Sequence, residues 1–173
     1  MDGFRSICFA VPMLRIACWR LTFEILHFFK LLGFRGGETS YFAYGGNLDP
    51  QVLKNRGIRP THSSPETAKD FVLRFNHDVP FVGIGMASIE KQEGSIVHGI
   101  VYQLSKVDEW ILDCYEAHLF FRRYRKAYLV LNGKKCFYYY SGRAGNELLP
   151  SKGYLQKLVN GYKTSFPPDS PFI

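Results

Sequence analysis

The segment YRKAYLVLNGKKCFYYYS, residues 124–141, constrains the fold of this chain more than any other feature. It contains two runs of strand-forming aliphatic and aromatic residues, which are joined near Asn132-Gly133. An Asn-Gly pair favours a type I′ turn, because both central residues of that turn have positive φ. The segment therefore predicts a β-hairpin.

Further strands are predicted before the hairpin. The segments 68–77 and 81–90 have the composition of strands, and another strand is predicted over 93–104 after a turn at Glu93-Gly94. The chain also has fifteen Phe and eleven Tyr, which favours a β-rich core because aromatic side chains pack well on pleated surfaces.

Three short helices are indicated by their capping residues. They are expected over 49–57, with Asp49 as N-cap and Gly57 at the end, over 105–116, with Ser105 as N-cap, and from Ser151 to about Asn160, ended by Gly161. Together the strands and helices predict an α+β domain with a small twisted or barrel-like sheet and short flanking helices.

The first forty residues differ from the rest of the chain. They are rich in apolar residues, but Arg5, Arg15, Arg20, Glu24 and Lys30 interrupt every stretch that could span a membrane. Dispersed arginines fit an interfacial amphipathic helix or an organelle-targeting leader; a helix packed on the domain, or an extension with no folded role, are equal alternatives. GFRGGETS is expected to be a flexible joint, so the chain divides into a leader (1–40) and a domain (41–173).

Composition narrows the classes of partner. The formal charge of +7 suits an anionic ligand or an acidic membrane surface. Nucleic-acid binding is not expected, because the basic residues are scattered and form no recognisable signature.

Neither a metal site nor a cofactor is expected, since the four cysteines show no zinc-like spacing and no phosphate-loop or dinucleotide motif occurs. Reduced thiols predict a cytoplasmic location, with organelle targeting or peripheral membrane contact through residues 1–40 as the alternative.

One loop and one carboxylate carry the candidate chemistry. The segment YFAYGGNL, residues 41–48, ends an aromatic run on Gly45-Gly46 and then places Asn47. This is either an ordinary tight turn or a loop whose backbone N–H groups bind a ligand. Glu116 ends a predicted helix, where the helix dipole disfavours an ionised carboxyl group, as a general base near neutral pH requires. Asp113 has a similar position, and spacing alone does not separate the two.

Several segments in the same order resemble the γ-glutamylcyclotransferase family. YFAYGGNL resembles the family's YGSN signature, and AKDFVLRFNH, GIGMASI, VHGIVYQL, LDCYE and RRYRKAYLVL follow in the expected order, over about residues 41–162. The resemblance implies the family's small barrel and a cofactor-independent cyclisation of a γ-glutamyl amino acid or amine to 5-oxoproline. It places Glu116, rather than Asp113, on the family's catalytic glutamate, as general acid and base.

The resemblance also implies which residues bind the small-molecule substrate: Tyr44, Gly45, Gly46, Asn47, Leu48, Tyr124 and Tyr139. Two departures stand beside this site, because the serine of YGSN is Gly46 and the glycine that follows the catalytic glutamate is Ala117. They favour an alternative of another class, a non-catalytic module that binds a small ligand in the same pocket. The preferred leaving group and the formation of a homodimer stay open.

Overall fold

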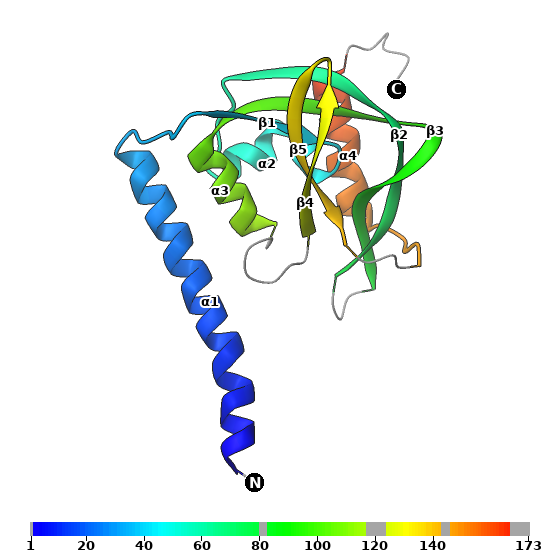
Figure 1. Ribbon diagram of the computed structural model, residues 1–173. Coiled ribbons are helices and arrows are strands. Elements are labelled where there is room, and N and C mark those ends of the chain that lie inside the picture. The colour runs from blue at the N-terminus through cyan, green and yellow to red at the C-terminus, as the bar shows by residue number, and fades with distance from the viewer. Residues whose placement is uncertain (1, 80–82, 117–123, 143–145, 167–173) are drawn as a thin grey trace.

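The computed structural model describes residues 2–79, 83–116, 124–142 and 146–166. The elements are α1 (Asp2–Leu31), β1 (Glu38–Ala43), the 3-10 helix η1 (Gly46–Leu48), α2 (Pro50–Asn55), β2 (His62–Val79), β3 (Ile84–Ser105), α3 (Lys106–Tyr115), β4 (Tyr124–Leu131), β5 (Lys134–Ser141) and α4 (Lys152–Ser165). The α+β class is confirmed. The strands form one curled half-barrel sheet, with helices around it (Figure 1).

The sheet is mixed, and its centre is buried on both faces. Its strand order is β2-β3-β1-β5-β4; β1 pairs parallel with β5, and the other neighbours pair antiparallel. Because successive side chains of a strand point to opposite faces, Tyr41 and Ala43 join one apolar cluster while Phe42 and Tyr44 join another. This double burial is the physical reason for the unbroken aromatic run in β1.

Local turn and cap chemistry places several elements as predicted. The hairpin of β4 and β5 turns at Asn132 and Gly133, whose φ values are 48° and 78°. Asp49 caps α2 by accepting from the Gln51 N–H at 2.9 Å, and Ser105 caps α3 by accepting from the Asp108 N–H at 3.1 Å.

Two glycine signals were misread. The predicted turn at Glu93-Gly94 is wrong, because β3 runs through it; Gly94 (φ 74°) lies at a register shift opposite Asp70 (φ 62°), whose carboxylate accepts the Gly94 N–H at 3.0 Å. The predicted end of α4 at Gly161 is also wrong, since the helix continues to Ser165. Gly161 is buried, and a Cβ there would lie 2.6 Å from Leu48 Cβ. It permits a close approach of α4 to η1.

The second half of α1 packs against α3. The Trp19 indole donates to the Cys114 carbonyl at 2.8 Å, and the Phe23 ring meets the edge of Tyr115 at 5.2 Å. Leu26 lies in the same apolar cluster as α3. The N-terminal half of α1 extends away from the rest of the molecule (Figure 1). None of the described helices is long and apolar enough to cross a membrane.

Candidate active site

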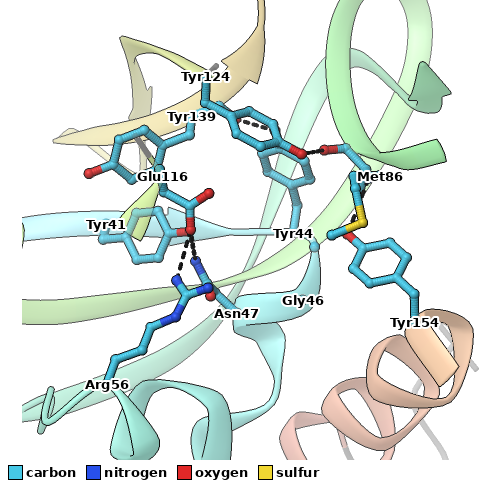
Figure 2. Close-up of a pocket in the computed structure, with 12 residues that line it drawn as sticks. Tyr41, Tyr44, Gly46, Asn47, Arg56, Met86, Glu116, Tyr124, Tyr139 and Tyr154 are labelled. Carbon is cyan, nitrogen blue, oxygen red and sulfur yellow. Dashed lines mark hydrogen bonds and ion pairs between the residues drawn. The ribbon is translucent and has the colours of Figure 1, made fainter. Parts of the chain in front are cut away.

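A pocket opens where the loop after β1 meets the end of α3 (Figure 2). Its walls come from segments far apart in the chain, and its twelve lining residues are Tyr41, Tyr44, Gly45, Gly46, Asn47, Arg56, Met86, Ala87, Glu116, Tyr124, Tyr139 and Tyr154. Six of the seven predicted substrate-binding residues and the predicted catalytic glutamate are therefore brought together, and Leu48 is not among the lining residues.

Glu116 supplies the carboxylate of the pocket. It is the C-cap of α3, where its N–H donates to the Leu112 carbonyl at 2.8 Å. Its side chain is 14% exposed, and Oε1 accepts from Arg56 Nη1 at 2.8 Å and from Asn47 Nδ2 at 3.1 Å. The other oxygen, Oε2, faces the tyrosine side of the pocket (Figure 2). Both donors contact one oxygen, so the second is presented to the pocket.

Arg56 is a charged residue of the pocket that sequence reasoning missed. It is the C-cap of α2, and its guanidinium lies 4.7 Å from the centre of the Tyr115 ring while it pairs with Glu116. A helix over this segment was predicted, but no pattern in the sequence indicated that Arg56, at its C-cap, faces Glu116. The pocket thus contains an adjacent cation and anion, and not an isolated acid.

The glycine loop forms a tight 3-10 turn that also lines the pocket. The Leu48 N–H donates to the Gly45 carbonyl at 2.9 Å, and the Leu48 side chain is fully buried in the core. The Asn47 amide donates to the Tyr41 hydroxyl at 2.8 Å as well as to Glu116. Asn47 therefore connects the loop to Glu116, while the buried Leu48 side chain fixes the loop to the apolar core.

Tyr154 of α4 closes the pocket on the side of the glycines, and it was not predicted. Its hydroxyl accepts the Ala87 N–H at 3.1 Å, and its ring lies beside Gly46. A Cβ at Gly46 would lie 3.2 Å from the Tyr154 ring, a tight contact. The absence of a side chain at Gly46 therefore lets the Tyr154 ring pack directly against the loop.

The side chains of Tyr44, Tyr124 and Tyr139 form the remaining wall. Tyr44 donates to the Tyr139 carbonyl, and Tyr124 donates to the Ala87 carbonyl at 3.1 Å while its ring stacks on His77 at 3.9 Å. Burial raises the pKa of Tyr44 and of Tyr139 well above the usual range. Tyr44 and Tyr139 therefore keep their hydroxyl protons at physiological pH, and each donates that proton within the protein.

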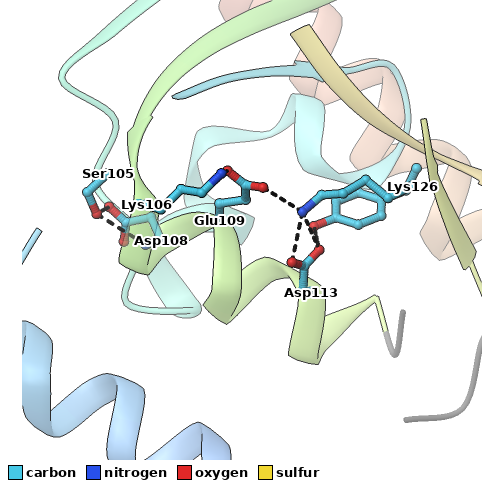
Figure 3. A network of polar contacts seen from close by, with 7 residues as sticks. Ser105, Lys106, Asp108, Glu109, Asp113 and Lys126 are labelled. Carbon is cyan, nitrogen blue, oxygen red and sulfur yellow. Dashed lines mark hydrogen bonds and ion pairs between the residues drawn. The ribbon is translucent and has the colours of Figure 1, made fainter. Parts of the chain in front are cut away.

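Asp113, the rival carboxylate, belongs to a buried ionic network beside the pocket (Figure 3). Its Oδ1 accepts from the Tyr139 hydroxyl at 2.6 Å and lies 2.7 Å from Lys126 Nζ. Lys126 also pairs with Glu109 at 2.7 Å. Asp113 is thus engaged behind the tyrosine wall, and it supports Tyr139. No cluster of His, Cys, Asp and Glu side chains suited to a metal ion occurs among the residues that the structure describes.

Comparisons with known proteins agree with this architecture. The family model described as gamma-glutamyl cyclotransferase, AIG2-like, matches residues 41–156. No curated protein sequence matches the chain significantly.

Solved structures share the fold. The human protein loc79017 has 24% identity and a TM-score of 0.65, with 76% of this chain and 82% of that chain covered. A structure described as gamma-glutamyl cyclotransferase has 23% identity and a TM-score of 0.64 over the same shares. A yeast gamma-glutamyl cyclotransferase specific to glutathione has 12% identity and a TM-score of 0.54, with 76% and 89% covered. Because the family model spans most of this chain, the protein belongs to the AIG2-like gamma-glutamyl cyclotransferase family.

Proposed function

We propose that this protein is a γ-glutamylcyclotransferase that converts a γ-glutamyl amino acid or amine to 5-oxoproline, with Glu116 as general acid and base. Family membership supports a cyclotransferase-type enzyme. The observation that carries the proposal is the pairing of Glu116 with Arg56 at 2.8 Å in a partly open pocket.

The Arg56–Glu116 pair complements the head group of a γ-glutamyl compound. That head group has an ammonium and a carboxylate on one carbon atom. A guanidinium binds a carboxylate through two parallel hydrogen bonds, and a carboxylate accepts from an ammonium. On this account the substrate opens the ion pair, and its carboxylate binds Arg56 while its ammonium lies against Glu116. The small-molecule partner is therefore an α-amino acid derivative.

Proton transfer by Glu116 would drive the cyclisation. Glu116 removes one proton from the ammonium, which gives the α-nitrogen a lone pair. The α-nitrogen attacks the γ-carbonyl carbon and forms the ring C–N bond. The bond from that carbon to the leaving nitrogen then breaks, and the leaving nitrogen takes the proton from Glu116. The ring nitrogen also loses its second proton, which the released amine takes up to become an ammonium ion. Atoms and charges then balance, and the products are 5-oxoproline and a free amine or amino acid.

Positioning accounts for much of the expected acceleration. Ring closure joins two groups of one molecule. A pocket that binds the substrate in its folded conformer therefore removes much of the entropy cost of bringing the α-nitrogen to the γ-carbonyl carbon. The loop of Gly45, Gly46 and Asn47 would approach the reacting carbonyl closely, because glycines present backbone without side chains. Backbone N–H groups of this loop are proposed donors to the developing oxyanion. The Asn47 amide would join them when substrate displaces its contact with Glu116, and the side chains of Tyr124 and Tyr139 line the opposite wall.

The contacts of Arg56 and Asn47 with Glu116 are also compatible with a non-catalytic module that binds a small amino acid derivative. An assay of 5-oxoproline release by the full chain separates the two functions. Its panel contains γ-glutamyl amino acids, γ-glutamyl amines and glutathione. Release from one class supports the enzyme and identifies its leaving group. Saturable binding of a panel member without release by folded protein supports the binding module.

A further inference from the structure

α1 exposes large apolar side chains on the side that faces away from the domain. We define this apolar face by five residues in and directly after α1: Leu21 (63% exposed), Ile25 (43%), Phe28 (58%), Phe29 (45%) and Leu32 (66%). Their spacing of three, four and seven places them along one side of a helix. In the sequence, the seven-residue spacing of Leu21 and Phe28 continues back to Leu14 and Ile7.

The apolar face is separate from the side of α1 that packs on the domain. Trp19, Phe23 and Leu26 occupy the packed side, where they contact α3 and the core. A surface helix that packs on its own domain ordinarily presents polar residues on the other side. Large exposed apolar patches mark sites of association with another surface. The packing of α1 within this domain therefore leaves its apolar face unexplained.

The width of the apolar face favours a lipid surface over a second copy of the helix. Leu21, Ile25, Phe28 and Leu32 alternate as in the seam of a coiled coil. In a soluble coiled coil the positions beside the seam usually carry charges. Here Glu24 is charged, but Phe29 and Leu31 occupy further positions beside the seam and are exposed by 45% and 86%. A broad face of Phe and Leu matches a helix that lies in a bilayer interface.

Charge complementarity indicates which lipids. Arg20 and Arg35 are exposed at the two ends of the described apolar face, and Glu24 is the acid on this part of the helix. The whole chain has a formal charge of +7. Basic residues beside an apolar helix face attract anionic headgroups.

We infer that α1 binds the surface of an anionic membrane, with its axis parallel to the bilayer and its apolar face in the acyl boundary. The contact lies on the membrane and does not span it, since Arg20 and Glu24 stay at the level of the headgroups. The proposal is independent of the reaction, because the pocket is lined by residues outside α1.

Co-sedimentation of the full chain with vesicles tests this inference. The vesicles contain phosphatidylcholine and phosphatidylserine, or phosphatidylcholine alone. The variant Leu21→Glu/Phe28→Glu adds two charges to the apolar face. Its matched control, Val130→Glu/Leu149→Glu, adds them at residues that are 69% and 88% exposed elsewhere. Circular dichroism and thermal unfolding verify that both variants are folded.

The expected result is binding of the unchanged protein and of the control to phosphatidylserine vesicles. The bound-to-free ratio should fall about tenfold or more for Leu21→Glu/Phe28→Glu. Binding should weaken as salt is raised from 0.05 to 0.5 M, because salt screens headgroup attraction. Equal binding of both double variants, or no binding of the unchanged protein, would overturn the inference. A wild-type dimer that becomes monomeric in Leu21→Glu/Phe28→Glu, with a disulfide between copies at the exposed Cys18 under mild oxidation, would assign the face to a second copy instead.

Discussion

Arg56 Nη1 lies 2.8 Å from Glu116 Oε1, and this contact joins the C-cap residues of two helices, α2 and α3. Arginine at a helix C-terminus is favoured by the helix dipole, whereas glutamate there is disfavoured. The cation therefore stabilises an acid in a position that would otherwise be costly. It also gives the pocket the two charges that an α-amino acid head group requires.

Arg56→Met should weaken substrate recognition. Loss of a charge-assisted contact with the substrate carboxylate is worth roughly 1.5–3 kcal/mol, so kcat/KM should fall about ten- to a hundredfold, mainly through KM. Arg56→Lys should recover part of the loss, because it keeps the charge without the planar fork. Steady-state kinetics measure both, with Arg59→Met at an exposed position as the control. An unchanged KM in Arg56→Met would exclude the proposed carboxylate contact.

Trp19→Phe should destabilise the whole domain, although Trp19 lies outside the segment that matches the family. The substitution keeps an aromatic ring and removes the N–H that donates to the Cys114 carbonyl. The free energy of unfolding should fall by about 1–2 kcal/mol. Leu21→Ala on the exposed side should change it by less than about 0.5 kcal/mol. Urea titrations followed by circular dichroism measure these free energies of unfolding. Equal stability of Trp19→Phe and the unchanged protein would mean that the contact of α1 with α3 does not stabilise the domain.

Gly161→Ala should destabilise the protein even though alanine is the better helix former. The added methyl group would lie 2.6 Å from Leu48 Cβ and 2.8 Å from the Asp49 N atom. Overpacking costs about 1–3 kcal/mol, which exceeds the gain of about 1 kcal/mol in helix propensity. Gly153→Ala in the same helix meets no atom within 4 Å and should be neutral or stabilising. Thermal unfolding compares the pair, and equal midpoints would refute the close approach.

Lys126→Met should produce a stability defect that depends on pH. Burial raises the pKa of Glu109, but hydrogen bonds from Lys106 and Lys126 outweigh burial, so the net pKa is lowered. A lowered carboxyl pKa contributes stability above the ordinary value of about 4.3, and this stability is lost as pH falls through the folded-state pKa.

Removal of Lys126 should therefore cost about 3 kcal/mol or more at pH 7, because Glu109 and Asp113 lose a shared cation. The difference from the unchanged protein should shrink as pH falls through the lowered folded-state pKa of Glu109, where this carboxylate becomes protonated. Urea unfolding from pH 7 to pH 3.5 measures it, with the exposed Lys134→Met as control. A defect of constant size across this range would argue that Lys126 acts through packing alone.

The sequence predicts those features that depend on neighbouring residues. Asp49, Ser105 and the Asn132-Gly133 pair each act within a few positions, and each occurs in the structure as predicted. The glycines at 94 and 161 were misjudged, because a glycine with positive φ at a register shift, as at 94, or at a close approach to a distant segment, as at 161, has the same local signature as one that ends an element.

In the pocket, too, residues with signals along the sequence were predicted and residues that depend on distant contacts were not. Glu116 was singled out from its position at a helix end and from the ordered segments that resemble the family, and both can be read along the sequence. Arg56 and Tyr154 were not identified, since their roles arise only when α2 and α4 are folded against the glycine loop. Asp113 could be separated from Glu116 only by resemblance, and the structure places it with Lys126 and Tyr139.

The most direct test of the central claim is 5-oxoproline release by Glu116→Gln in the full chain. Glutamine keeps an oxygen acceptor for Arg56 but cannot carry the proton, so release should fall by about a hundredfold or more. Competition binding of a γ-glutamyl compound should weaken less than release, because the glutamine oxygen still accepts from the ammonium, and Glu93→Gln at an exposed position should match the unchanged protein. If folded Glu116→Gln released 5-oxoproline at the rate of the unchanged protein, this would contradict the assignment of Glu116 as the general acid and base.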